Sequence, residues 1–396
     1  MNSHGTTKSI LLVGVACALV AALVGYVAGR TMPATSEPAP VQETAQEQET
    51  VQAQETVQAA DAATTGHVTL DGWREDSEAL AALTAFVESS VDEASEGYIP
   101  PEDRIAVFDM DGTLMGERFP TYFSDWLCVW RALDDDTYAA PEGMREKAEG
   151  WRDEVLAGEE MLESERREAM RLFEGLSVEE FKDVVRRFKE VPAWGFSGMT
   201  YGESFFRPMV SVVRYLREMG YTVYVCSGTW RDALRAMSEG TLDEWIPVER
   251  VIGTDILLVA ANQGGEDGVD HTMVSGEQVL VGDHYLTKNL KANKVYSIAH
   301  EIGRRPVLAF GNSGGDISMG AYTLDNPDYE GQAFMLLCDD TERDYGDTDV
   351  ADAFAAKCEA AGFHTVSMRD DWTTIYGEGV QKAGGSDQGA ELADAA

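Results

Sequence analysis

The sequence predicts an α/β protein with a mainly parallel sheet, preceded by a transmembrane helix. Three observations carry this prediction. From about residue 70 to residue 380, short apolar runs alternate with amphipathic stretches, as in α/β folds. Three of the apolar runs stop at clusters of Asp, Asn, Ser, Thr and Gly, and open α/β sheets bind ligands at the carboxyl ends of their strands. Residues 9–29 form a 21-residue segment without a charged side chain, which is long enough to span a bilayer.

The apolar segment defines an N-terminal region of residues 1–30. It is longer than the apolar core of a cleavable signal peptide, which has about 7–15 residues, so we predict an uncleaved signal anchor. Lys8 precedes the segment, and acidic residues dominate after Arg30. The positive-inside rule therefore places the N-terminus in the cytoplasm. We expect a single-pass protein of the cell membrane whose remaining residues are extracytoplasmic.

Two further segments carry the composition of disorder. Residues 31–66 repeat Gln-Glu-Thr and Val-Gln and contain no aromatic residue, so they cannot bury a core and are predicted to be a disordered linker. Residues 381–396 are rich in Gly, Ala and Asp and are predicted to be a flexible tail.

The composition excludes several functional classes. The chain has 396 residues, with 70 acidic and 31 basic side chains and a formal charge of −39. Such acidity argues against nucleic-acid binding, which needs a basic face. The five cysteines contain no CxxC pair and the six histidines are scattered, so neither a disulfide framework nor a histidine zinc site is expected. A hydrophobic content of 44% is enough for a buried core.

The elements follow in order along the folded region. The predicted strands are 104–108, 222–226, 306–310, 333–337 and 364–367, with short β segments in 249–281. The predicted helices are 76–91, 119–133, 141–156, 159–174, 177–189, 207–219, 294–302 and 347–360. Residues 119–190 lack strand signals and show apolar positions at helical spacing, so they are expected to form a separate helical layer.

The first chemical motif is Asp109-Met110-Asp111-Gly112-Thr113, directly after a predicted strand. One carboxylate of such a pair can attack phosphorus, and the other can act as general acid and base. Gly112 allows the chain to turn sharply. The alternative is an ordinary Asp-Gly turn.

Two further motifs also follow predicted strands. Ser227-Gly228-Thr229 offers hydroxyl and main-chain N–H groups to phosphate oxygens, although in isolation an ordinary strand-to-helix turn with a Ser/Thr cap is the favoured interpretation. Asn312 and Asp316 in Gly-Asn-Ser-Gly-Gly-Asp offer oxygen ligands of the kind that Mg²⁺ prefers. The alternative is a glycine-rich loop with a helix cap at Asp316.

A lysine is expected to neutralise the crowded carboxylates and phosphate. Lys288, Lys291 and Lys294 precede the predicted strand at 306–310. Lys294 opens a predicted helix, which fixes its position, so it is the candidate. The other two are assigned to the solvated surface.

In this order the four clusters resemble the haloacid dehalogenase-like (HAD) hydrolase superfamily, in particular its phosphoserine-phosphatase-like branch. The resemblance covers about residues 105–337. It implies a Rossmann-like core (67–114 and 208–380), an inserted helical cap (115–207) and dependence on Mg²⁺. It also implies the following roles. The catalytic residues are Asp109 as nucleophile, Asp111 as general acid and base, and Lys294 for charge balance; phosphate binding falls to Ser227, Gly228 and Thr229; and the metal ligands are Asp109, the main chain of Asp111, Asn312 and Asp316.

One position departs from the family pattern, because many members have an aspartate where Asn312 stands. Asparagine keeps the oxygen ligand but removes a negative charge. Asp111 favours phosphatase over dehalogenase chemistry, since family dehalogenases lack an acid and base there. The expected function is hydrolysis of a small phosphate monoester at the membrane. The alternatives are a phosphotransferase and a catalytically weak phosphate-binding module.

The substrate is expected to contact the cap, which is rich in aromatic residues. They are Phe119, Tyr122, Phe123, Trp126, Trp130, Trp151, Trp194, Phe196 and Tyr201. The simpler interpretation is a helical core. The sharper one is an aromatic cage for a cationic headgroup such as phosphocholine, and the chain loosely resembles secreted phosphorylcholine phosphatases. Glu117 and Arg118, just past the first motif, either touch the substrate or form a solvated ion pair.

Overall fold

The computed structural model describes residues 70–383. The predicted anchor, the linker and residues 384–396 of the predicted tail lie outside the described residues. Within 70–383, no helix combines the length and the apolar character that crossing a bilayer requires.

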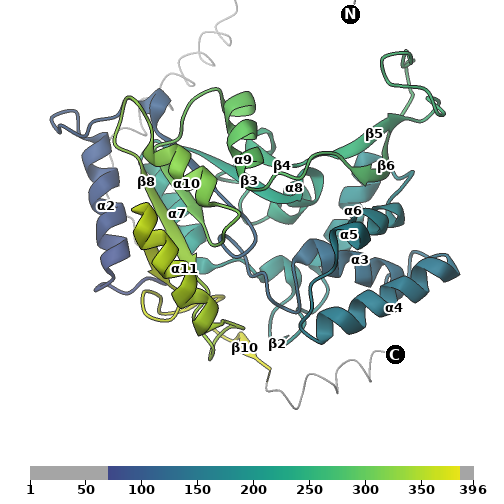
Figure 1. The fold of residues 1–396 in the computed structure, drawn as a ribbon, viewed down its shortest axis with the longest axis horizontal. Helices are drawn as coiled ribbons and strands as arrows, with labels where there is room; N and C mark the ends of the chain where they lie inside the picture. Colours follow the sequence, from purple (N-terminus) through teal and green to yellow (C-terminus); the bar gives the residue numbers. More distant parts are fainter. Residues whose placement is uncertain (1–69, 384–396) are drawn as a thin grey trace, which may run out of the picture. The chain divides into compact units, whose positions relative to one another are not determined.

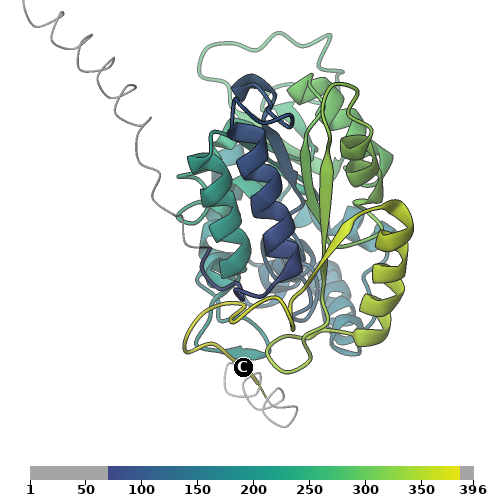
Figure 2. The same ribbon diagram turned by 90° about the vertical axis from the view of Figure 1, so that its left-hand side faces the viewer.

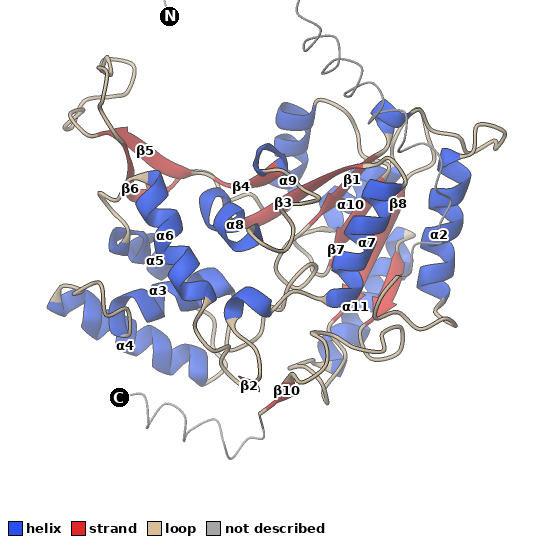
Figure 3. Cartoon of the chain, turned by 180° about the vertical axis from the view of Figure 1, so that it is seen from behind, coloured by secondary structure: helices blue, strands red, loops and turns tan. Residues whose placement is uncertain are grey.

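A six-stranded sheet forms the centre of the described region (Figures 1 and 3). Its strands are β1 (Ile105–Phe108), β3 (Thr222–Trp230), β4 (Val251–Thr254), β7 (Leu308–Gly311), β8 (Gln332–Leu337) and β9 (His364–Ser367). They are parallel throughout, in the order β4-β3-β1-β7-β8-β9. The strand β1 thus lies between β3 and β7. The chain runs outward from β1 to one edge of the sheet through β3 and β4, and to the other edge through β7, β8 and β9. Such a switch point is where open α/β sheets bind ligands.

Helices cover both faces of the sheet (Figure 2). One face packs against α9 (Ala292–Ser297), α10 (Ile317–Leu324) and α11 (Thr348–Ala361), and the other against α2 (Glu78–Val91) and α7 (Arg207–Glu218). The four residues of β1 are all buried and contribute alternately to the two cores: Ile105 and Val107 to one, Ala106 and Phe108 to the other. A strand buried on both faces explains the uninterrupted apolar run in the sequence.

The expected helical layer is present between β1 and α7. It consists of α3 (Phe123–Leu133), α4 (Glu142–Leu156), α5 (Glu163–Ala169) and α6 (Val178–Lys189). In α6, the buried residues Phe181, Val184, Val185 and Phe188 form one apolar face, as their helical spacing predicts. Ser177 caps this helix by accepting a hydrogen bond from the main-chain N–H of Glu180 (3.2 Å).

A hairpin of β5 (Ile256–Ala260) and β6 (Val279–Tyr285) leaves the sheet after β4 and contacts the helical layer. The main-chain N–H of Val281 donates to the carbonyl of Leu176 (2.8 Å), and that of Gly175 donates to the carbonyl of Val281 (2.9 Å). The sequence places these residues in the core portion 208–380. In the structure the hairpin contacts the helical layer and extends the cap. Sequence pattern does not reveal this contact, because the two segments lie about a hundred residues apart.

The boundaries differ from the predicted ones at several points. The helix predicted at 119–133 begins at Phe123, and that predicted at 159–174 consists of α5 and a 3₁₀ turn at Met170–Leu172. The strand predicted at 222–226 continues to Trp230, where it still pairs with β4. α8 (Arg231–Ser238) then follows at once.

The predicted tail also begins too early. Gln381 and Lys382 form β10, which pairs with β2 (Phe196–Ser197) of the cap portion. The Lys382 ammonium donates to the carbonyl oxygens of Thr341 (3.0 Å) and Asp344 (2.8 Å). These bonds tie the end of the described chain to the loop between β8 and α11.

Candidate active site

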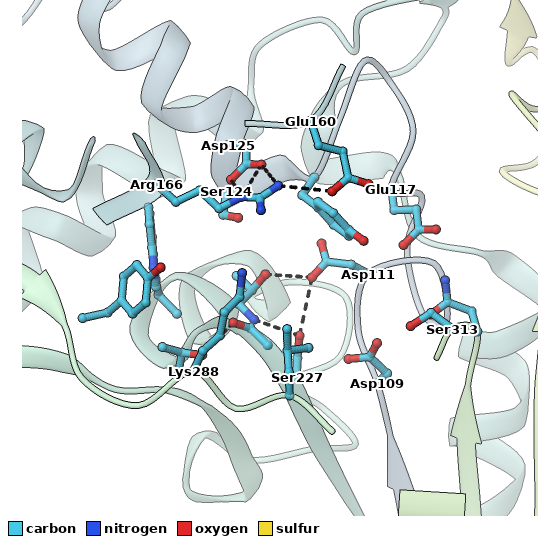
Figure 4. A pocket seen from close by; sticks show the side chains of 18 residues that line it. Asp109, Asp111, Glu117, Ser124, Asp125, Glu160, Arg166, Ser227, Lys288 and Ser313 are labelled. Atoms are coloured by element: carbon cyan, nitrogen blue, oxygen red, sulfur yellow. Dashed lines mark hydrogen bonds and ion pairs between the residues drawn. The ribbon is translucent and has the colours of Figure 1, made fainter. Parts of the chain in front are cut away.

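A cavity of about 180 Å³ opens at the carboxyl ends of β1, β3 and β7 (Figure 4). Its two sides come from different parts of the chain. The core wall, on the strand ends, comprises Asp109, Asp111, Ser227, Thr229 and Asn312. The cap wall, on the helical layer and the β5–β6 hairpin, comprises Tyr122, Asp125, Glu160, Arg166 and Tyr285. The cavity lies at the topological switch point, where the sequence places it.

Asp109 and Asp111 both enter the cavity from the turn after β1. The turn bends at Gly112, whose φ is +71°, a conformation that favours glycine. A Cβ at this position would lie 2.0 Å from Asn312 Nδ2 and 2.7 Å from Glu117 Cδ. Gly112 therefore serves two purposes: it turns the chain and lets the loop after β7 approach.

The end of β3 holds Asp111 in place. Thr229 Oγ1 donates to Asp111 Oδ2 (2.8 Å), and Ser227 Oγ does so at 3.4 Å. Residues two apart in a strand share a face, so both hydroxyl groups point to one carboxylate. Gly228 lines the cavity and lets Leu290 approach, since a Cβ would lie 2.6 Å from Leu290 Cδ2. The phosphate-binding role predicted for these residues stays a prediction.

Lys294 is fully buried beneath the core wall. Its Nζ lies 2.7 Å from Asp109 Oδ1 and 2.6 Å from Asp316 Oδ1. Burial by itself disfavours the ammonium form, but the two carboxylates raise the pKa of Lys294 above its usual value. Of the three candidate lysines, the structure thus brings Lys294 to the carboxylates, as predicted. Lys288, assigned to the surface, also lines the cavity, 3.6 Å from Glu163.

Asp316 is engaged within the protein. Its Oδ2 accepts hydrogen bonds from the main-chain N–H groups of Asn312 and Ser313 (both 3.1 Å), while Oδ1 faces Lys294. These contacts use both carboxylate oxygens and identify Asp316 as a positioning residue for Lys294 and for the loop after β7. The metal-ligand role expected for Asp316 from the sequence stays a prediction.

Burial raises the pKa of three carboxyl groups around the cavity to about 7. For Asp109, burial is the largest cause and the Asp316 carboxylate adds to it, against the opposing effect of Lys294. For Asp111, burial outweighs the hydrogen bond from Thr229. For Glu117, burial outweighs the attraction of Arg118. Negative charge is costly here because it is removed from water, and Lys294 offsets only part of it.

These features fit a divalent cation. Asp109, the main-chain oxygen of Asp111 and the Asn312 amide provide oxygen donors, which Mg²⁺ prefers, and a cation would relieve the crowded buried charge. Asp111 Oδ1 is buried without a hydrogen-bond partner in the described structure. Residues 70–383 contain no group of three His, Cys, Asp or Glu side chains arranged to hold a metal ion.

The cap wall was not predicted from the sequence, apart from Tyr122. Arg166 Nε donates to Asp125 Oδ2 (2.9 Å), and its Nη2 lies 3.8 Å from Glu160 (Figure 4). Asp125 is buried on α3 between Phe123 and Trp126, and an acidic residue inside an apolar helix face was the one available signal. Arg166 and Tyr285 carry no such signal, because only the tertiary fold brings α5 and β6 to the cavity.

The aromatic residues of the cap mainly form its core. Of the nine named above, Tyr122 lines the cavity. Phe119 packs edge-to-face against Phe196 (5.0 Å between ring centroids), and Trp130 lies beside Phe188 (5.5 Å). The simpler interpretation of these residues, a helical core, therefore accounts for most of them.

Comparison with known proteins identifies the family of this chain. The sequence profile described as haloacid dehalogenase-like hydrolase matches residues 106–321. This is more than half of the chain, so the protein belongs to the HAD family of hydrolases, which confirms the family inferred from the motifs. No protein of curated function matches the sequence.

Three solved structures with different names are similar to this chain. A functionally unknown protein from Anaerococcus prevotii is 14% identical, with 77% of this chain and 94% of that chain covered and a TM-score of 0.47. Cytosolic 5'-nucleotidase IIIB bound to cytidine is 13% identical (76% and 88% covered, TM-score 0.40). A probable phosphoserine phosphatase from Vibrio cholerae is 14% identical (68% and 62% covered, TM-score 0.33).

Proposed function

We propose that the protein is a Mg²⁺-dependent phosphatase that hydrolyses a small phosphate monoester through an aspartyl-phosphate. The observation that carries this proposal is the division of labour between Asp109 and Asp111. Asp109 is paired with the buried Lys294, whereas Asp111 is held by Thr229 and keeps one oxygen free of hydrogen bonds in the described structure. Two adjacent carboxylates in different environments suit two different tasks.

In the first step, an oxygen of Asp109 attacks phosphorus and the bond from phosphorus to the ester oxygen breaks. Protonated Asp111 gives its proton to the leaving alkoxide, which departs as the alcohol. In the second step, water attacks phosphorus, Asp111 takes its proton, and the bond to Asp109 breaks. Inorganic phosphate leaves and both carboxyl groups return to their starting states.

The other groups bind and balance charge. Lys294 offsets the negative charge of Asp109 beside the phosphoryl group. Mg²⁺, when bound, would be held by Asp109, the main chain of Asp111 and Asn312, and supplies positive charge to the phosphoryl oxygens. Ser227 and Thr229 fix Asp111 and line the space that the phosphate would enter.

The cavity supports a proposal for the substrate class. Its volume of about 180 Å³ is below the roughly 300–1,000 Å³ of pockets that hold drug-sized ligands. Glu117 and Glu160 line it, whereas the cations Arg166 and Lys288 are paired with Asp125 and Glu163. A neutral or cationic leaving group is therefore favoured over a second anionic group. Phosphocholine is therefore the first ester to compare with esters that carry additional carboxylate groups.

The test compares the full chain, purified in mild detergent, with its Asp109→Asn variant on a panel of phosphate esters with Mg²⁺. We expect the variant to lose about 10³-fold or more in kcat. Hydroxylamine attacks the acyl carbon of an aspartyl-phosphate and releases phosphate, so it should convert Asp109 to a hydroxamate in the wild type only. Asp267→Asn, in an exposed loop, is the matched control. Equal inactivity of wild type and variant on every ester rejects the proposal. Phosphate transferred to added alcohols instead identifies a phosphotransferase.

For location, we propose a membrane-tethered protein with an extracytoplasmic catalytic region. This proposal rests on the sequence of residues 9–29. Protease treatment of intact cells tests it: the catalytic region should be degraded while a cytoplasmic marker survives. Protection of the catalytic region overturns the outward-facing topology.

A further inference from the structure

The side chains of Asn312 and Glu117 come together behind the turn after β1. Both approach Gly112, where a Cβ would lie 2.0 Å from Asn312 Nδ2 and 2.7 Å from Glu117 Cδ. A hydrogen bond from the Asn312 side chain lowers the pKa of Glu117, against the larger effect of burial. Two segments about two hundred residues apart in the chain thus meet at the edge of the cavity.

These contacts fix the direction of the Asn312 amide. Its Oδ1 accepts a hydrogen bond from Thr113 Oγ1 (3.3 Å), which leaves a second lone pair on that oxygen. Its Nδ2, which can only donate, lies beside the same point of Gly112 as the Glu117 carboxyl carbon. An amide held in this way presents oxygen, not nitrogen, to a cation in the cavity.

Glu117 also supplies charge. Its side chain is 11% exposed, and it forms an ion pair with Arg118 Nε at 3.8 Å, on a side chain that is 44% exposed. When ionised, the Glu117 carboxylate is only partly neutralised by Arg118 and little screened by water, so it acts strongly on a neighbouring cation.

We propose that Glu117 and Asn312 together perform the task of a single aspartate at the metal site: Asn312 provides the oxygen, and Glu117 orients its amide and restores the missing negative charge. This inference rests on the proposed Mg²⁺-dependent function. Carboxylates that hold a ligand from behind typically change metal affinity about 10–100-fold.

The experiment is a calorimetric titration of the full chain with Mg²⁺ alone, without substrate. Glu117→Gln should weaken Mg²⁺ binding by about tenfold, because it removes the negative charge beside Asn312. Glu117→Gln with Asn312→Asp should return the affinity to within about threefold of the wild type, because the charge then sits on the ligand itself. Glu160→Gln removes a carboxylate from the cap wall of the same cavity and should change Mg²⁺ affinity by less than about twofold.

Three results overturn the proposal. Glu117→Gln with unchanged Mg²⁺ affinity but a raised KM for a cationic ester would show that Glu117 binds substrate instead. A double variant as weak as Glu117→Gln would show that the two residues do not substitute for one aspartate. An equal loss in Glu160→Gln would show that only the total charge of the cavity matters.

The same variants distinguish a loss of folding from a loss of function. Melting temperatures without Mg²⁺ show whether each variant is folded, and Glu117→Gln should melt no lower than the wild type because it removes a buried charge. If no variant hydrolyses any ester, the proposed function fails, yet the Mg²⁺ titration still decides the role of Glu117.

Discussion

The two walls of the cavity hold their charges in different ways. On the core wall, Asp109 and Asp111 are buried, their pKa values are raised to about 7, and Asp111 keeps an oxygen without a hydrogen-bond partner in the described structure. On the cap wall, Arg166 is already bound to Asp125 and lies near Glu160. The charges of the core wall are thus only partly offset by Lys294 and are suited to chemistry, whereas the central charges of the cap wall form an ion pair that shapes the substrate space.

The largest effect is expected from Lys294→Met, which removes the buried cation of the core wall. Asp109 and Asp316 then face each other without a counter-charge, so we expect a loss of about 10³-fold or more in kcat and about 3–5 kcal/mol in the free energy of unfolding. The pKa of Asp109 should then rise further, because Lys294 no longer lowers it, so the stability deficit should shrink as pH falls and Asp109 becomes neutral.

Ester kinetics and denaturant unfolding at several pH values check this prediction. Lys288→Met is the control, since Lys288 lies on the same cavity but pairs with the half-exposed Glu163. A loss in Lys288→Met comparable to that in Lys294→Met would contradict the expectation that the buried Lys294 matters more than the partly exposed Lys288.

Asp111→Asn should have the next largest effect, and its size should depend on the leaving group. General acid catalysis contributes about 10²–10⁴-fold, so kcat on alkyl phosphates should fall within this range. On p-nitrophenyl phosphate the loss in kcat/KM, which reports only the first chemical step, should be much smaller, because that leaving group departs without a proton. Steady-state rates on both esters make the comparison. Equal losses on both would assign Asp111 to positioning instead of proton transfer.

Arg166→Gln tests the cap wall and should act on binding more than on chemistry. We expect KM to rise about tenfold while kcat stays within about threefold, because Arg166 shapes the wall through Asp125 and does not reach the strand ends. Kinetics on a neutral and on a cationic ester measure the split. A fall in kcat as large as that of Asp111→Asn would mean that both walls take part in the chemistry.

The smallest effect is expected outside the cavity, at Asp344, where burial raises the pKa to about 6 despite hydrogen bonds from Tyr345 N–H (2.7 Å) and Tyr376 OH (2.9 Å). The folded state holds its proton more tightly than the unfolded state, so this carboxyl lowers stability as pH rises from about 4 to about 6. Relative to wild type, Asp344→Asn should gain about 1–3 kcal/mol between pH 4 and pH 7. Urea unfolding measures the difference; a constant difference across this range would show that Asp344 is not a strained acid.

The sequence by itself determined the core wall. Asp109, Asp111, Ser227 and Thr229 lie on strand ends, and Lys294 opens a helix, so local pattern was enough to name them. Parallel strands bring their carboxyl ends to one edge of the sheet, which is why motifs more than two hundred residues apart could be assigned to one site. The same pattern supplied the α/β class and the helical layer, because buried strands and amphipathic helices carry their signal in consecutive residues.

Only the tertiary structure decided the rest. It assigned Asp316 to Lys294, joined Glu117 to Asn312, brought Arg166, Asp125 and Tyr285 to one wall, and tied residues 381–382 to the cap. Each of these depends on a contact between segments that are distant in the chain, and no repeating pattern in the sequence links such segments. Hydrogen-bond direction and burial, which set the charge of each group, arise only when such segments pack together. The sequence therefore named the groups that react, and the fold determined which neighbours tune them.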